Sequence, residues 1–196
     1  NAMNKGLSLC SGEYVMFLNS GDYFFSTSSL QYLSKNLTDR DVIYGDICLV
    51  RDEKFFRVNS PDSILFATKY QHNLPFQPAT AIKRPLYCLV GGFDESYKII
   101  GDIALLSMIF MDPDVKTCKI NKVITIFDET GISSTNIRWA MFERLLLLIR
   151  CKPSYLPAYL SLLTSIFVNY ACKSFLNLLS AAHKLVKKAS LIMLKI

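Results

Sequence analysis

The chain has 196 residues, of which 51% are hydrophobic, so it can bury one core with an appendage and is not a disordered or low-complexity protein. Its net charge of +6 is uneven: residues 132–196 carry nine Lys/Arg and one acid (9 − 1 = +8), and residues 1–131 carry 13 − 15 = −2. The six cysteines form no C-x-x-C pair and there are only two histidines, which argues against a zinc site and favours reduced thiols in the cytosol.

Short helices and strands alternate through the first 131 residues. Strands are predicted at 13–18, 41–47, 54–58, 79–83 and within 115–127. Helical segments are predicted at 3–10, 28–37, from Pro85 and at 102–111, with turns at 19–22 and 91–94. Strands mixed with short helices indicate an α/β fold.

The last third of the chain differs in composition. A Leu-rich helix is predicted at 138–150, and an uncharged run at 153–172 has the length of a membrane span, although prolines and polar residues interrupt it. Lys173, Lys184, Lys188 and Lys195 then share one face of a basic amphipathic helix, which we expect to lie in a membrane interface. The alternative is a helix packed on the domain with its lysines in water. We therefore divide the chain into a domain at 1–131 and a basic tail at 132–196.

One acid follows directly on the first long strand. The apolar run that ends at Leu18 leads into Asn19, Ser20, Gly21 and Asp22, all turn-forming residues. Open α/β sheets bind ligands at the carboxyl ends of their strands. Asp22 is thus placed to hold a metal or a phosphate-bearing substrate, although an ordinary turn between two elements has the same pattern.

Four segments follow one another along the chain: NAMNKG at 1–6 with SGEY at 11–14, FLNSGD at 17–22, DVIYGD at 41–46 and GGFDESYKIIGD at 91–102. In this order they resemble motifs of the GT-A-fold glycosyltransferases of family 2, in particular the bacterial branch that builds surface polysaccharides such as colanic acid. The resemblance implies the later part of a Rossmann-like GT-A domain. Because a nucleoside-binding βαβ unit precedes these motifs in the family, we expect this chain to lack that portion.

The resemblance also implies roles for single residues. Asp22 is similar to the acid that holds Mg²⁺ or Mn²⁺ on a nucleotide diphosphate sugar, and Asn19, Ser20 and Gly21 would line that donor. Asp102 resembles the general base that deprotonates the acceptor hydroxyl in an inverting transfer. The other interpretation of Asp102 is an acid favoured by the helix dipole at a helix start.

One departure from the family concerns a histidine. Gln77-Pro78-Ala79-Thr80 stands where relatives usually carry His-Gln, and His72 lies too early in the sequence to replace the missing His. If that His serves acceptor or metal binding in the family, its role is unfilled here.

The function that this resemblance implies is transfer of a sugar to a glycan or lipid-linked acceptor in surface polysaccharide synthesis. The tail would hold the protein on an anionic membrane surface, at the cytoplasmic face of the cell membrane. Trp139 is the only tryptophan and aromatic residues do not interleave with the basic face, so no nucleic-acid partner is expected. The alternative is a non-catalytic, truncated remnant that binds a membrane or a partner protein through its tail.

Overall fold

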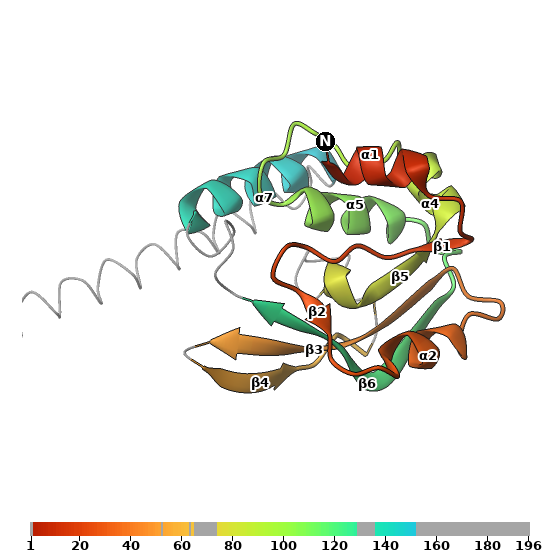
Figure 1. Cartoon of the computed structure of the whole chain (residues 1–196). Helices are drawn as coiled ribbons and strands as arrows, with labels where there is room; N and C mark the ends of the chain where they lie inside the picture. The colour runs from red at the N-terminus through yellow and green to blue at the C-terminus, as the bar shows by residue number, and fades with distance from the viewer. Residues whose placement is uncertain (1, 52, 63, 65–73, 129–135, 152–196) are drawn as a thin grey trace, which may run out of the picture. The chain divides into compact units, whose positions relative to one another are not determined.

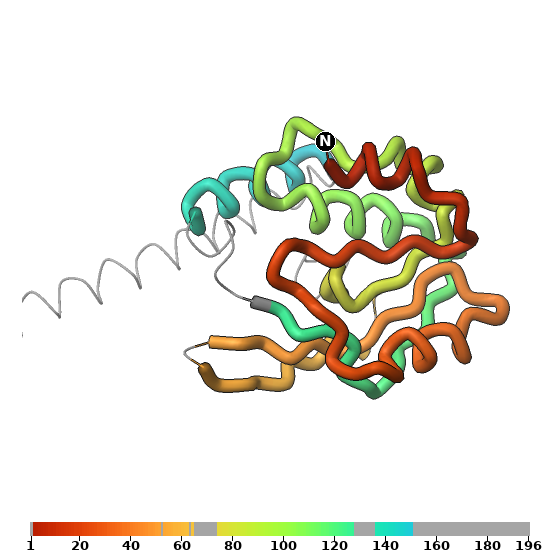
Figure 2. The backbone as a smooth tube through the Cα atoms, viewed as in Figure 1, coloured from red at the N-terminus to blue at the C-terminus, as the bar shows by residue number. Residues whose placement is uncertain are grey.

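The computed structural model describes residues 2–51, 53–62, 64, 74–128 and 136–151 (Figures 1 and 2). By its contacts the chain divides into two units, residues 1–147 and 148–196. The uncharged run at 153–172 and the lysine-bearing helix beyond it lie outside the described residues. Among the helices of the described part, none has both the length and the apolar character needed to cross a bilayer.

The described part of the first unit contains a mixed sheet of six strands. These are β1 (Tyr14–Val15), β2 (Tyr23–Phe24), β3 (Val42–Arg51), β4 (Lys54–Val58), β5 (Thr80–Lys83) and β6 (Thr117–Asp128). The strand order is β1-β5-β3-β6-β2, and β4 pairs with the second half of β3. β3 and β6 are parallel, whereas the other pairs are antiparallel. The predicted α/β class is therefore confirmed in its coarse form.

Helices cover both faces of this sheet. They are α1 (Ala2–Leu9), α2 (Ser29–Ser34), α4 (Arg84–Leu89), α5 (Gly101–Ile109) and α7 (Ile137–Cys151), with a 3₁₀ turn, η1, at Gln77–Ala79. Successive β3 residues enter two different cores: Val42 and Tyr44 pack with α4 and α5 residues, whereas Ile43 packs with Leu33 of α2. Side chains of a strand alternate between faces, so a strand buried on both faces has a continuous apolar run. Figure 1 shows α1, α4 and α5 together on one side of the sheet and α2 on the other.

The first strand is shorter than predicted. Only Tyr14 and Val15 join the sheet, paired with Lys83 and Ile82, and of residues 13–18 only Val15 is buried. The expectation of a long buried strand was wrong because β1 lies at the edge of the sheet. Its one partner in the sheet is β5, and of that strand only Ile82 and Lys83 pair with β1.

A close approach between β3 and β6 explains Gly45. The register of this parallel pair shifts between Tyr44 and Asp46. A Cβ atom at Gly45 would lie 2.5 Å from Ile124 Cγ1 and 2.6 Å from the backbone oxygen of Lys122. No real Cβ contact is that short, so any side chain at this position would push β6 away from β3.

Candidate functional site

The turn that carries Asp22 is closed by two hydrogen bonds. The Asp22 backbone N–H donates to Asn19 O (3.0 Å), and the Asn19 N–H donates to Asp22 Oδ2 (3.3 Å). Gly21 has a φ of 94°, a conformation that glycine adopts without strain. Asn19, Ser20 and Gly21 are exposed and Asp22 is half-buried. The turn therefore presents three exposed residues beside one carboxylate. Its backbone lies between β1 and β2 and can be followed in Figure 2.

An aromatic cluster joins this turn to the loop before α5. The Phe17 ring meets the Phe93 ring edge to face, with centroids 5.3 Å apart, and meets the Tyr87 ring at 5.9 Å. Phe93 and Tyr87 are buried in the same core as Leu105 and Leu106 of α5. In Figure 1 the chain between β1 and β2 and the first turn of α5 lie at the same end of the sheet. Two of the motifs that were recognised separately thus belong to one region.

Asp102 lies in the first turn of α5, as predicted. Its Oδ1 accepts a hydrogen bond from the backbone N–H of Ile103 (2.8 Å). Asp102 is half-buried, and this burial raises the pKa of its carboxyl group; the Ile103 N–H and the positive charge of Arg144 oppose the rise without cancelling it. A carboxylate with a raised pKa accepts a proton more readily, which is what a general base requires. The roles of Asp102 and Asp22 stay predictions.

No motif in the sequence points to Glu143, the one acid of the basic tail. It is 3% exposed and lies on α7, yet its carboxylate accepts hydrogen bonds from the backbone N–H groups of Lys98, Ile99 and Ile100. Burial alone would raise the pKa of Glu143, but these three bonds and one from the Trp139 indole outweigh it and lower the pKa. The only signal in the sequence was an isolated acid within a Leu-rich helix.

Gln77 is another buried polar residue, and it lies at the end of the sheet that carries the Asp22 turn. It is 3% exposed, and within the described part of the chain neither its Nε2 nor its Oε1 has a hydrogen-bond partner. Its 3₁₀ turn precedes β5, which runs antiparallel to β1, so Gln77 lies at the end where β1 leads into the Asp22 turn. A buried amide without partners is costly unless a ligand or water satisfies it.

Phe76 directly precedes Gln77, at the segment where the sequence resemblance implies a histidine. It packs against the core on the α2 side of the sheet, and its backbone oxygen accepts a hydrogen bond from Thr80 Oγ1 (2.7 Å). No imidazole is therefore supplied by this position. His72 lies outside the described residues.

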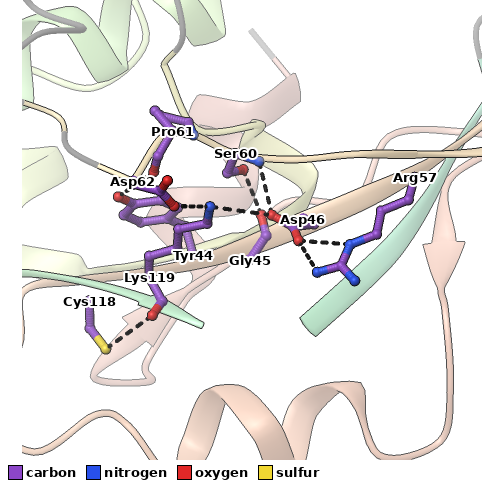
Figure 3. Close-up of polar contacts among 9 residues, drawn as sticks. All are labelled: Tyr44, Gly45, Asp46, Arg57, Ser60, Pro61, Asp62, Cys118 and Lys119. Carbon is purple, nitrogen blue, oxygen red and sulfur yellow. Dashed lines mark hydrogen bonds and ion pairs between the residues drawn. The ribbon is translucent and has the colours of Figure 1, made fainter. Parts of the chain in front are cut away.

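Asp46 forms a polar cluster whose role is structural (Figure 3). It is 1% exposed, and its carboxylate accepts hydrogen bonds from Arg57 Nε (3.1 Å), Arg57 Nη2 (2.6 Å) and the Ser60 N–H (2.9 Å). Lys119 Nζ lies 3.9 Å from Asp46 Oδ1, and Ser60 Oγ donates to Gly45 O at 2.6 Å. The charge is paired and hydrogen-bonded, as a buried carboxylate must be. The cluster holds the end of β4 and the residues after it against β3.

A metal at Asp22 would need most of its ligands from the substrate. Within the described ranges no group of three or more His, Cys, Asp or Glu side chains is arranged to hold a metal ion. The half-buried Asp22 carboxylate fits one oxygen ligand of Mg²⁺ or Mn²⁺, and the donor's phosphate oxygens would fit others.

The sequence of the chain is distantly similar to that of known glycosyltransferases. No family model matches the chain. It is 24% identical over 151 residues to the PGL/p-HBAD biosynthesis glycosyltransferases of Mycobacterium tuberculosis and Mycobacterium bovis. The match covers 74% of this chain but 57% of each relative, so the chain spans little more than half their length. These similarities support a distant relationship to glycosyltransferases.

Proposed function

We propose that the chain contributes the acceptor-side half of an inverting glycosyltransferase of the family 2 type. It would act on a nucleotide diphosphate sugar and a glycan or lipid-linked acceptor in surface polysaccharide synthesis. The observation that carries the proposal is Asp102, a carboxylate with a raised pKa at the start of α5, in a loop joined through Phe93 and Phe17 to the Asp22 turn. The relationship to glycosyltransferases supports the same reaction class.

In the proposed reaction Asp102 accepts the proton of the acceptor hydroxyl. The hydroxyl oxygen then attacks the anomeric carbon while the bond from that carbon to the diphosphate oxygen breaks, so the configuration inverts. Asn19, Ser20 and Gly21 offer exposed backbone to the diphosphate, and Asp22 would hold the divalent cation. The chemistry that such a cation supplies is neutralisation of the charge on the departing diphosphate.

The decisive experiment is sugar transfer, or donor hydrolysis, by the complete protein and its Asp102→Asn variant. Loss of a general base costs roughly 10²- to 10⁴-fold in rate. We expect a loss of that size in kcat while donor affinity stays unchanged. Near-normal turnover in the variant would remove Asp102 from the role of base.

We propose that the protein works at the cytoplasmic face of the membrane, and one face of α7 supports this. Trp139, Phe142 and Leu146 are spaced by three and four residues and are 47%, 49% and 43% exposed. Arg138 is exposed beside them, and the only acid of the helix, Glu143, is buried. An apolar face with positive charge and no exposed acid suits an anionic lipid surface.

Vesicle flotation tests this part of the proposal. The protein should float with vesicles that contain anionic lipid, and the Trp139→Ser/Phe142→Ser double variant should bind them less. Absence of binding to any vesicle would overturn the membrane proposal without bearing on the reaction.

A second candidate function is a non-catalytic remnant that binds a membrane or a partner protein. The lack of a histidine at the segment where core-packed Phe76 lies favours it, as does the single carboxylate of the Asp22 turn. Titration of the protein with a nucleotide diphosphate sugar and Mn²⁺ separates the two. No binding at millimolar donor would favour the remnant.

A further inference from the structure

The Glu143 side chain of helix α7 reaches the segment just before α5. Glu143 Oε1 accepts hydrogen bonds from the Lys98 N–H (2.7 Å) and from Trp139 Nε1 (2.8 Å). Its Oε2 accepts from the N–H groups of Ile99 (3.0 Å) and Ile100 (3.1 Å). Each carboxylate oxygen thus receives two donors, and the three backbone partners are 43 to 45 residues away in sequence. We call this set of four hydrogen bonds the Glu143 clamp.

The clamp acts on the residues that lead directly into α5. Ile100 precedes the first helical residue, Gly101, and Asp102 follows next. On its other side α5 is already fixed, because Leu105 and Leu106 are buried in the core. The backbone N–H groups of residues 98–100 point at Glu143 rather than at a strand or a helical turn. The start of α5 is therefore anchored from upstream by Glu143.

A second contact joins the same two segments. Lys98 Nζ lies 5.6 Å from the centre of the Trp139 ring, close enough for a cation–π interaction. Trp139 therefore contacts Lys98 with its ring and Glu143 with its indole N–H. This arrangement orients the Glu143 carboxylate as well as the loop.

We propose that Glu143 is a positioning residue for the reaction: its carboxylate fixes the backbone of residues 98–100 and so fixes where the first turn of α5 presents Asp102. The inference rests on the proposed function for the meaning of Asp102. Within the described part of the chain, the hydrogen bonds to the Glu143 carboxylate come from backbone N–H groups and Trp139, so we assign Glu143 no part in the proton transfer. A displacement of about 1 Å at a catalytic group costs on the order of 10²-fold in rate.

Glu143→Gln and Glu143→Asp form a graded pair of variants. Glutamine offers one oxygen and turns an NH₂ group toward donors, whereas aspartate keeps two acceptor oxygens on a shorter side chain. We expect Glu143→Gln to lower kcat about 100-fold with the dissociation constant of the donor unchanged. The kcat of Glu143→Asp should lie within about tenfold of the wild-type value. Glu53→Gln, an exposed Glu at the β3–β4 turn, is the matched control and should keep wild-type kcat.

Trp139→Phe is a milder variant that tests the same clamp if Glu143→Gln does not fold. It keeps a ring for Lys98 and removes one donor to Glu143, so kcat should fall by about fivefold. A folded Glu143→Gln protein with kcat within twofold of the wild type would overturn the inference. A parallel fall in kcat, donor affinity and unfolding temperature, with no recovery in Glu143→Asp, would also overturn it, because that pattern marks a purely structural role.

Hydrogen exchange tests the clamp without any assay of transfer. In Glu143→Gln the amides of residues 98–102 should exchange faster than in the wild type, and in Glu53→Gln they should not. Unchanged exchange at these amides would overturn the inference whatever the activity. Absence of transfer by the wild type would instead overturn the proposed function, and the exchange data would still decide whether Glu143 holds the loop.

Discussion

Asn4 and Phe93 are joined by a reciprocal pair of hydrogen bonds across 89 residues of sequence. Asn4 Nδ2 donates to Phe93 O (2.8 Å), and the Phe93 N–H donates to Asn4 Oδ1 (2.8 Å). Asn4 Nδ2 also lies 3.0 Å from Glu95 Oε1. One side-chain amide therefore satisfies both backbone groups of a loop residue, as a strand neighbour would. The α1 segment, which resembled a family motif in the sequence, holds the loop that leads to Asp102.

Alanine substitutions at Gly92 and Gly91 test how much the contact between Asn4 and the loop contributes to stability. Both have positive φ, +77° and +80°, but a Cβ at Gly92 would lie 2.9 Å from Asn4 Oδ1, whereas a Cβ at Gly91 meets nothing within 4 Å. Gly91→Ala should therefore cost only the strained backbone, about 1 kcal/mol, and Gly92→Ala should cost roughly 1–3 kcal/mol more because Asn4 must move. Urea unfolding of both variants measures the difference. Equal losses would show that Asn4 contributes little to the loop.

The pH dependence of transfer should report Asp102 and its neighbour Arg144. A general base works only when deprotonated, and burial raises the pKa of Asp102, so the acid limb of kcat/KM should lie above the ordinary carboxyl value of about 3.9. The positive charge of Arg144 opposes this rise, so Arg144→Gln should move the limb to higher pH. The measurement is a pH–rate profile of both proteins. A limb that moves to lower pH in the variant would contradict the assignment.

Acid should release the Glu143 clamp. The clamp lowers the pKa of Glu143 below its unfolded value of about 4.3, so the unfolded chain takes up the proton more readily than the folded one. The stabilisation is thus fully present above about pH 4.3 and is lost as the pH falls through the lower, folded-state pKa. Asp41, paired with Lys83 at 3.1 Å, shifts in the same direction, and its contribution is lost in the same range.

The fluorescence of Trp139, the single tryptophan, should report the protonation of Glu143. Trp139 donates to Glu143, so its emission should change as Glu143 is protonated in the folded protein. Fluorescence titration of the wild type against Glu143→Gln provides the measurement. The same titration in the variant as in the wild type would mean that another acid is responsible.

Gln77 should be expendable for folding but not for transfer. Its buried amide has no partner in the described part of the protein, so Gln77→Leu should leave the free energy of unfolding unchanged or raise it by about 1 kcal/mol. If a ligand satisfies the amide, kcat/KM should fall by roughly tenfold or more. Denaturant unfolding and steady-state kinetics test the two halves. A clear loss of stability with normal kinetics would make Gln77 a structural residue.

The local sequence was sufficient to predict several helices, strands and turns and the position of the candidate site. The strand predicted at 54–58 has the bounds of β4, and the helices predicted at 102–111 and 138–150 match α5 and α7 to within two residues. Gly21, Gly91 and Gly92 marked turns that do adopt positive φ. These features depend on the conformational preferences of neighbouring residues, which a sequence displays directly.

The sequence by itself therefore determined the α/β class, the turn at Asp22 and the helix start at Asp102. Only the tertiary structure decided that β1 stops at Val15, that β3 and β6 run parallel, and that Asn4 and Glu143 hold the loop between Phe93 and Asp102. The reason is that these features are hydrogen bonds between residues 43 to 89 positions apart. Their partners are set by how the helices pack on the sheet, and the residue types of a lone Asn and a lone Glu do not reveal which backbone groups they will meet.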